Sequence, residues 1–331
     1  MNEDRLLEIK DLSIAVRQND KNVPIVKGID MMIPRGSIVG LVGESGCGKS
    51  MTARAVNKTL PPAAKITGGN IFWYEHTGRA TDLLALDEKE MRRRCGTDIS
   101  MIFQEPMTSL NPMMRVGDQI VEVLKIHGLE KKHSRAKERA IKMLEEVGIP
   151  QPEARYRAWP HELSGGMRQR VMTAMAMICS PKLLIADEAT TALDVTTQAQ
   201  ILELIRSMCR ASSMSALVIT HNMGVVSQIC DYVYVMYLGR IMEHATVKEL
   251  FSKPLHPYTR GLLSSVPKVG GNPEYLETIP GNVPDLPGDF PGCEFSIRCS
   301  EDTRKCFFKR PSLVNAGDDH YVRCHVADRV R

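Results

Sequence analysis

The sequence predicts an α/β fold organised around a largely parallel β-sheet. Three short apolar runs indicate the buried strands: residues 37–43 (SIVGLVG), 183–186 (LLIA) and 216–219 (ALVI). Each run is continuously apolar and stops at a glycine or a polar residue, as expected of a strand covered on both faces. The segments between them have helical texture, and strands that alternate with helices are typical of parallel sheets with crossover connections.

Composition and charge place the chain among ordinary globular proteins. Of its 331 residues, 43% are hydrophobic and 25% are charged, and the formal net charge is +4. That charge is too small to indicate nucleic-acid binding, and we interpret the RRR run at 92–94 as a solvated face. We find no apolar core of a signal peptide at the start and no apolar stretch near the ~18 residues of a membrane helix. We therefore expect any membrane role to come through a partner.

The middle of the chain is predicted to be a helical subdomain inserted in the sheet domain, over about residues 105–165. Its clearest helix spans 134–148, where apolar residues follow helical spacing between a serine and a glycine. After Asp231, the stretch YVYVMYLGRIMEHAT alternates around Gly239 and predicts a closing hairpin.

The stretch GESGCGKS directly follows the first predicted strand and fits the pattern G-x-x-x-x-G-K-[ST]. In this pattern backbone N–H groups turn onto phosphate oxygens, Lys49 provides a cation for the β and γ phosphates, and Ser50 Oγ is placed to ligate Mg²⁺. The helix that follows adds its positive dipole end. A glycine-rich turn with an incidental lysine is the simpler alternative, but the strand, the spacing and the helix-forming MTARAV favour a nucleotide site. The expected nucleotide contacts are Gly43, Glu44, Ser45, Gly46, Cys47, Gly48, Lys49, Ser50 and Met51.

Further stretches narrow the kind of nucleotide site. LLIADE (183–188) is an apolar strand ending in two carboxylates, as a Walker B strand does; Asp187 would hold Mg²⁺ through water and Glu188 would polarise the attacking water. LSGGMRQR (163–170) places a serine and two glycines at a helix start, a second anion-binding terminus. TALD (191–194) follows the acids, and the next strand ends at His221 in VITHN. A salt-bridged sheet edge or a structural histidine explains single stretches, but the order of the motifs is far more specific.

In this order the motifs resemble those of the ATP-binding subunits of ABC transporters, over about Leu7 to Lys253. The resemblance implies a P-loop NTPase fold with a RecA-like α/β core, an antiparallel β part and an inserted helical subdomain, in a nucleotide-binding domain at 1–253. It also implies ATP and Mg²⁺ as cofactors, ATP hydrolysis, and a dimer in which the LSGGM motif of one subunit serves the ATP held by the other.

The resemblance also assigns roles to single residues. Gln104, in MIFQEP, is expected to sense the γ-phosphate and Mg²⁺ and to signal to the membrane subunits, and His221 is expected to contact the γ-phosphate. Hydrolysis then depends on positioning, on charge neutralisation by Lys49 and Mg²⁺, and on a water oriented by Glu188. The expected catalytic residues are Glu188, His221, Lys49 and Gln104; the Mg²⁺ ligands are Ser50, Gln104 and Asp187; further ATP contacts are Ser164, Gly165, Gly166 and Asp194.

Three positions depart from the family pattern. The family usually stacks an aromatic residue on adenine after the first strand, whereas this chain has Val16 or Arg17 there and no aromatic residue before Phe72. We expect aliphatic packing or a guanidinium stack on the base, and weak base selectivity. Cys47 replaces a common serine and is interpreted as a neutral small residue. Ala189 stands where proline is usual, with little expected consequence.

Two narrower stretches resemble the branch of the family that powers import of oligopeptides, dipeptides and sometimes nickel or other metal chelates. They are FQEPMTSLNPMMRVGDQI (103–120) and PLHPYTRGLL (254–263). The resemblance implies a paralogous ATPase as dimer partner, two membrane permease subunits, an extracytoplasmic substrate-binding protein acting indirectly, and a place on the cytoplasmic face of the membrane. Met101, Met107, Met113 and Met114 either fill a core or form an adaptable docking surface. The alternative function is a soluble, non-transport ABC-type ATPase whose cysteine segment binds or senses a metal.

The C-terminal region, residues 254–331, is expected to hold a Pro/Gly-rich linker (266–292) and a small irregular Cys-rich domain with little core of its own. Its cysteines have the spacing C-x₅-C-x₆-C-x₁₇-C, without the C-x₂₋₄-C pair of a zinc knuckle, so spacing alone leaves the metal open. The nine cysteines of the chain favour reduced thiols or metal ligation over disulfides. The family resemblance favours a [4Fe–4S] cluster with Zn²⁺ as the alternative, followed by empty or disulfide-linked thiols. The expected ligands are Cys293, Cys299, Cys306 and Cys324, with His320 and His325 as alternative nitrogen ligands.

Overall fold

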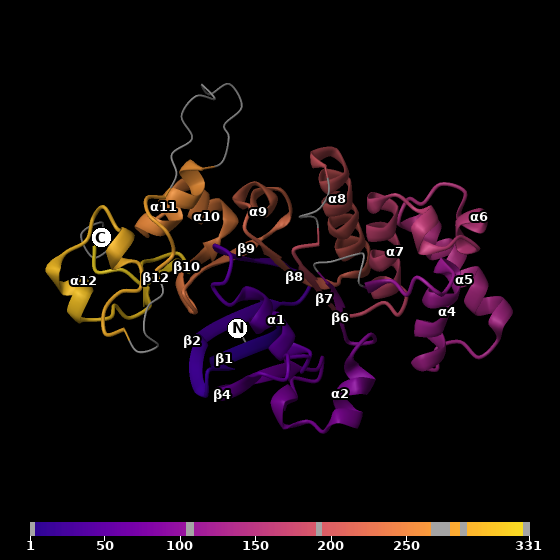
Figure 1. Cartoon of the computed structure of the whole chain (residues 1–331), viewed down its shortest axis with the longest axis horizontal. Coiled ribbons are helices and arrows are strands. Elements are labelled where there is room, and N and C mark those ends of the chain that lie inside the picture. The colour runs from indigo at the N-terminus through magenta and orange to yellow at the C-terminus, as the bar shows by residue number, and fades with distance from the viewer. Residues whose placement is uncertain (1–3, 104–108, 190–193, 266–278, 285–289, 327–331) are drawn as a thin grey trace. The chain divides into compact units, whose positions relative to one another are not determined.

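The computed structural model describes residues 4–103, 109–189, 194–265, 279–284 and 290–326 (Figure 1). The chain divides into two compact units. The first unit comprises Met1–Pro34, Val39–Leu84 and Thr220–Arg331, and the second comprises Arg35–Ile38 and Ala85–Ile219. Within the described residues, no helix combines the length and the apolar character needed to cross a membrane.

The first unit contains a four-stranded antiparallel sheet in the order β2-β1-β4-β5. The strands are β1 (Arg5–Gln18), β2 (Lys21–Pro34), β4 (Ala64–Tyr74) and β5 (Ala80–Asp82). Leu7, Ile9 and Ile14 of β1 and Trp73 of β4 are fully buried, whereas many of their neighbours along the strands are partly exposed. Such alternation is typical of a sheet that covers a core with one face.

The first unit also contains a second set of paired strands. β3 (Ile38–Val42) pairs in parallel with β9 (Tyr232–Tyr237), β9 pairs antiparallel with β10 (Arg240–Thr246), and β10 pairs with β12 (Tyr321–Val322), which pairs with β11 (Val314–Asn315). The predicted hairpin around Gly239 is therefore confirmed. The helices of this unit are α1 (Lys49–Val56), α9 (Met223–Ile229), α10 (Val247–Ser252), α11 (Pro257–Ser264) and α12 (Arg304–Phe308), with the 3-10 turn η3 (Ser296–Arg298).

The C-terminal segment packs into the first unit, and the structure does not support a separate Cys-rich domain. Figure 1 shows the yellow end of the chain beside β10, α10 and α11. Phe295 and the buried cysteines 293 and 306 belong to one hydrophobic cluster with Tyr237 and Tyr258. The physical reason is the shortage of large apolar side chains in the segment, which buries the few it has against helices and strands of the preceding chain.

The second unit is an α/β unit with parallel strands. β6 (Ile99–Ile102), β7 (Leu183–Asp187) and β8 (Ser215–Thr220) pair in parallel in this order, which confirms the two buried strands predicted at 183–186 and 216–219. The predicted strand at 37–43 is likewise confirmed by β3, in which all five residues are buried.

Helices make up the rest of the second unit. They are α2 (Glu88–Arg94), α4 (Val116–Ile126), α5 (His133–Glu146), α6 (Pro152–Tyr156), α7 (Gly165–Met177) and α8 (Val195–Ser212), with the 3-10 turns η1 (Leu83–Ala85) and η2 (Pro160–Glu162). The helix predicted at 134–148 is confirmed as α5, which begins one residue earlier and ends two residues earlier. α4 approaches α6 closely at Gly117, where a Cβ atom would lie 2.1 Å from the Tyr156 ring.

Candidate nucleotide-binding site

The predicted phosphate loop lies in the first unit, between the buried strand β3 and helix α1. Two of its glycines are required by the backbone around them. At Gly43 a Cβ atom would lie 2.0 Å from the carbonyl oxygen of Met236, and at Gly48 φ is +110° and a Cβ atom would lie 3.1 Å from the Ile25 carbonyl oxygen. A side chain at either position would therefore push the loop away from its neighbours.

The lysine of the loop is buried and its ammonium faces loop carbonyls. Lys49 is 4% exposed, and Nζ donates to the carbonyl oxygens of Gly43 (2.8 Å) and Glu44 (2.9 Å). Its Nζ also lies 3.8 Å from Cys47 Sγ. Burial raises the pKa of the Cys47 thiol, although the nearby ammonium opposes the shift. A raised pKa keeps the thiol neutral at pH 7, as the interpretation of Cys47 as a neutral small residue requires.

Glu44 connects the phosphate loop to the C-terminal region. Its backbone N–H donates to the hydroxyl of Tyr258 on α11 (2.9 Å), and its carboxylate receives two hydrogen bonds from the Arg298 guanidinium at 2.7 and 3.1 Å. Burial raises the pKa of Tyr258, so its hydroxyl stays protonated. Sequence reasoning missed both partners. Tyr258 stands in the HPYT stretch that indicated the branch of the family, and no pattern in the sequence indicated Arg298.

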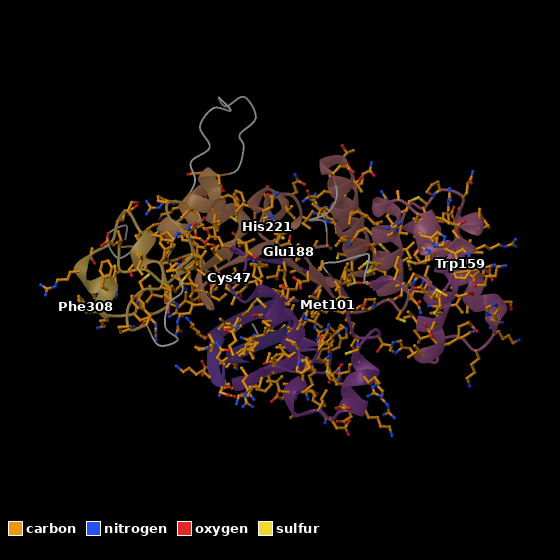
Figure 2. The ribbon with its side chains drawn as sticks, viewed as in Figure 1. Cys47, Met101, Trp159, Glu188, His221 and Phe308 are labelled. Atoms are coloured by element: carbon orange, nitrogen blue, oxygen red, sulfur yellow. The ribbon has the colours of Figure 1, made fainter. Side chains whose placement is uncertain are left out.

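His221 also belongs to the first unit, directly after β8 (Figure 2). Its side chain is exposed, and the next residue, Asn222, caps α9 by accepting a hydrogen bond from the Gly224 N–H (2.8 Å). The cap fixes the turn that presents the histidine at the end of the strand.

The predicted adenine-binding positions lie at the end of β1. Val16 pairs with Val23 of β2 and with Ala64 of β4. The Arg17 side chain is 70% exposed and forms an ion pair with Asp20 at 2.8 Å. A guanidinium stack on the base remains a prediction, and it would have to compete with this ion pair.

The two carboxylates of the predicted Walker B strand lie in the second unit. Asp187 ends β7 and is 2% exposed. Glu188 (Figure 2) has φ of +46°, and its backbone N–H donates to the Ile219 carbonyl oxygen on β8 (3.0 Å). A left-handed conformation at a residue with a full side chain is uncommon and concentrates at functional sites.

The LSGG and TALD motifs each begin a helix of the second unit. Ser164 Oγ caps α7 by accepting from the Met167 N–H (3.3 Å), and Gly166 lies so close to α8 that a Cβ atom would be 2.8 Å from Thr197 Cγ2. Asp194 caps α8 by accepting from the Thr197 N–H (2.9 Å), which lowers the pKa of the Asp194 carboxyl. Gln104 lies outside the described residues, as do 191–193 of TALD.

The four C-terminal cysteines lie in the first unit and are mostly buried. Cys293, Cys306 and Cys324 are 7%, 6% and 8% exposed, and Cys299 is half-buried. Among the residues that the structure describes, no three His, Cys, Asp or Glu side chains gather in an arrangement that could hold a metal ion. The predicted iron–sulfur or zinc site is therefore without support from the geometry.

The two alternative nitrogen ligands make other contacts. His320 Nε2 lies 2.7 Å from Oε1 of the fully buried Glu243, and His325 Nε2 lies 2.8 Å from the Lys309 carbonyl oxygen. A histidine engaged in this way would have to exchange its partner before it could bind a metal.

These features define a P-loop nucleotide-binding protein. The loop follows a buried parallel strand, contains glycines that its surroundings require, encloses its lysine and leads into a helix that begins at that lysine. Comparison with known proteins extends this conclusion. The family described as ABC transporter matches residues 26–191, and the family described as oligopeptide/dipeptide transporter, C-terminal region, matches residues 242–306. The chain belongs to the ABC transporter family, as the order of its motifs predicted.

Named relatives match nearly the whole chain. The oligopeptide transport ATP-binding protein AppD of Bacillus subtilis is 46% identical, over 96% of this chain and 96% of that protein. The dipeptide transport ATP-binding protein DppD of Bacillus subtilis is 45% identical, over 98% of this chain and 96% of that protein. A putative peptide import ATP-binding protein of Brucella melitensis is 46% identical over 98% of both chains. These relatives give no support to the non-transport alternative.

Solved structures agree on the fold. A dimeric ATP-binding cassette in a post-hydrolysis state, bound to ADP and phosphate, matches with a TM-score of 0.64 and 21% identity, over 73% of this chain and 98% of that one. The protein cbiO1 of Clostridium perfringens, part of an ABC transporter complex, matches with a TM-score of 0.61 and 26% identity, over 76% of this chain and 92% of that one. The predicted ABC ATPase fold is thereby confirmed.

Proposed function

We propose that this chain is the ATP-binding and ATP-hydrolysing subunit of an importer for peptides. The observation that carries the proposal is the phosphate loop at residues 43–50, with Lys49 enclosed by its carbonyls. The chain's relatives over nearly its full length are named as oligopeptide and dipeptide transport ATP-binding proteins. With this function we propose two domains. Residues 1–253 form the nucleotide-binding domain, and residues 254–331 form a C-terminal region specific to the importer.

Each motif residue has a proposed task in hydrolysis. The loop N–H groups and Lys49 bind the β and γ phosphates, and Lys49 neutralises charge that develops during phosphoryl transfer. Ser50, Gln104 and Asp187 would hold Mg²⁺, which would neutralise phosphate charge when bound. Glu188 orients the attacking water, and His221 contacts the γ-phosphate. Ser164, Gly165, Gly166 and Asp194 serve the nucleotide held by the dimer partner.

The partners follow from the same family branch. We propose a heterodimer with a paralogous ATPase, docked on two membrane permease subunits at the cytoplasmic face, with a substrate-binding protein acting on the other side. The SLNPMM stretch supports a docking role because Met113 is 81% exposed, which a methionine that fills a core would not be. Met101, by contrast, is half-buried on β6 (Figure 2).

For the C-terminal cysteines we propose a [4Fe–4S] cluster held by Cys293, Cys299, Cys306 and Cys324, with Zn²⁺ as the alternative. The donor chemistry fits either metal, since both take four thiolates. Burial is the main cause that raises the pKa of Cys293 to about 12 and of Cys299 to about 11, and nearby Cys306 and Cys324 add to both shifts. Cys293 and Cys299 thus each lie within electrostatic range of Cys306 and Cys324, and this proximity supports the proposal.

Co-purification from membranes tests the proposal. Affinity-tagged protein is extracted in mild detergent, and its partners are identified by mass spectrometry. We expect two multi-span membrane subunits and a second ATPase; their absence would contradict the transporter assignment. Iron, sulfide and zinc are measured on the same sample, prepared without oxygen. Iron with acid-labile sulfide and a broad absorbance in the visible region would support the iron–sulfur cluster. Zinc without iron would support the zinc alternative. A sample that contains neither metal would contradict both assignments.

A further inference from the structure

One ion pair on the phosphate loop is formed by a residue from the far end of the chain. The Arg298 side chain is 5% exposed, and it meets the carboxylate of Glu44 in a two-pronged arrangement, Nη1 to Oε2 at 2.7 Å and Nη2 to Oε1 at 3.1 Å. The third nitrogen of the guanidinium, Nε, donates to the Pro280 carbonyl oxygen at 2.9 Å. The guanidinium also lies over the Tyr237 ring, with Cζ 5.9 Å from the ring centroid. Paired, planar contacts of this kind hold both partners in one orientation.

Glu44 is one of the two loop residues whose carbonyl oxygens hold the lysine. Its carbonyl oxygen accepts from Lys49 Nζ (2.9 Å) and also from the Cys47 N–H (3.4 Å). Its N–H donates to Tyr258, so both the amide and the carboxylate are held by the C-terminal region while the carbonyl holds the lysine. A shift of the Glu44 side chain therefore moves the carbonyl that orients the phosphate-binding cation.

Arg298 is also directly joined to the cysteine segment. It ends the turn η3 and is followed by Cys299, whose N–H donates to the Ser296 carbonyl oxygen (3.4 Å). Three residues before this turn begins, the Cys293 N–H donates to the Cys306 carbonyl oxygen (2.7 Å). Cys299 thus directly follows the residue that contacts the phosphate loop.

We propose that Arg298 is a positioning residue of the nucleotide site: by clamping Glu44 it sets the geometry of the phosphate loop, so that the C-terminal segment controls nucleotide affinity. The inference rests on the proposed function only where it takes residues 43–50 as the ATP site. The contact between Arg298 and Glu44 thus acts as a clamp on the phosphate loop.

The test compares Arg298→Gln, Arg298→Lys, Glu44→Gln and the double variant Arg298→Gln/Glu44→Gln in the full chain. The dissociation constant of a fluorescent ATP analogue is measured beside the thermal midpoint. We expect about tenfold weaker binding in Arg298→Gln, the size of effect that corresponds to loss of one strong polar contact. Arg298→Lys should recover part of the loss because it keeps the charge without the fork. The double variant should be no weaker than the worse single variant, because the two residues act as a pair.

A second readout needs no nucleotide. Cys47 is 3% exposed inside the loop, so iodoacetamide reaches it only when the loop opens, and its alkylation rate, followed by peptide mass spectrometry, reports the population of open loop. We expect about tenfold faster alkylation in Arg298→Gln. Arg260→Gln is the matched control, because it breaks an ion pair from α11 to the same segment, with Glu301 at 2.7 Å, that does not touch the loop.

The outcomes distinguish a positioning role of Arg298 from a purely structural one. Faster alkylation of Cys47 in Arg298→Gln but not in Arg260→Gln supports the clamp, even in a chain that fails to bind ATP and so contradicts the proposed function. Unchanged affinity and unchanged alkylation in Arg298→Gln would overturn the clamp. So would a lowered thermal midpoint without either change, since Arg298 would then only stabilise the fold. Equal effects of Arg260→Gln would also overturn it, because any loosening of the segment would then suffice.

Discussion

The buried carboxylate of Glu243 should be a main point of attachment of the C-terminal segment, and Glu243→Gln measures its contribution. Glu243 is fully buried on β10. Its Oε1 accepts from the Leu255 N–H (2.7 Å) and lies 2.7 Å from His320 Nε2, while Oε2 accepts from the His256 N–H (2.9 Å). Burial alone would raise the pKa of Glu243, but these hydrogen bonds hold it below its ordinary value of 4.5.

The magnitude follows from the geometry. Glutamine has the same shape, but one of its two terminal atoms is an NH₂ group, so either the Leu255 N–H or the His256 N–H must face a donor. One charge-assisted hydrogen bond is lost and one buried donor is left without an acceptor, which costs about 2–4 kcal/mol in the free energy of unfolding of the first unit. Because the folded carboxyl pKa is lowered, this stabilisation is present above pH ~4.5 and is lost as the pH falls through the folded value.

Urea denaturation followed by tryptophan fluorescence measures the change. The chain has two tryptophans, and Trp73 is fully buried in the first unit, so a Trp159→Phe background restricts the signal to that unit. Glu249→Gln is the control, because its Oε1 lies 3.9 Å from His320 Nδ1 with a side chain 31% exposed, and we expect less than about 0.5 kcal/mol. Equal effects of the two substitutions would refute the reasoning.

Three further predictions rest on the structure. Glu188→Gln should keep ATP binding but reduce turnover at least ~100-fold, measured by phosphate release, and normal turnover would show that the catalytic carboxylate lies elsewhere. Burial lowers the pKa of His256 to about 4, so between pH ~6.5 and ~4 this histidine is protonated in the unfolded chain but not in the folded one. As the pH is lowered through this range, the free energy of unfolding should therefore fall by about 1.4 kcal/mol per pH unit from this residue. His256→Asn keeps an acceptor for the Tyr258 N–H and should reduce the slope of the free energy of unfolding against pH by the contribution of one proton over that range. An unchanged slope would contradict this role of His256. Gly48→Ala, with φ at +110°, should lower the free energy of unfolding by about 1–3 kcal/mol, more than Gly46→Ala, whose Cβ would meet no atom within 4 Å.

Short stretches of sequence were enough to predict the local elements of this protein. The strands β3, β7 and β8, the helix α5 and the hairpin of β9 and β10 were predicted within two residues at each end, because apolar periodicity and flanking glycines act over a few positions. The phosphate loop was predictable for the same reason: eight consecutive residues contain its glycines, its lysine and its serine. The order of the motifs also identified the family, which the comparisons confirmed.

The packing of the C-terminal segment, in contrast, could not be predicted from local patterns. The family resemblance and the few large apolar side chains predicted a small metal-stapled domain. The structure instead pairs β12 with β10 and buries Cys293 and Cys306 in one cluster with Tyr237 and Tyr258. Arg298 and Glu44 are 254 positions apart, and His320 and Glu243 are 77 apart. No local sequence pattern predicts such pairs, because the packing of the whole unit brings the two residues together. The same contacts would contribute little to stability if the carboxylates were exposed to solvent.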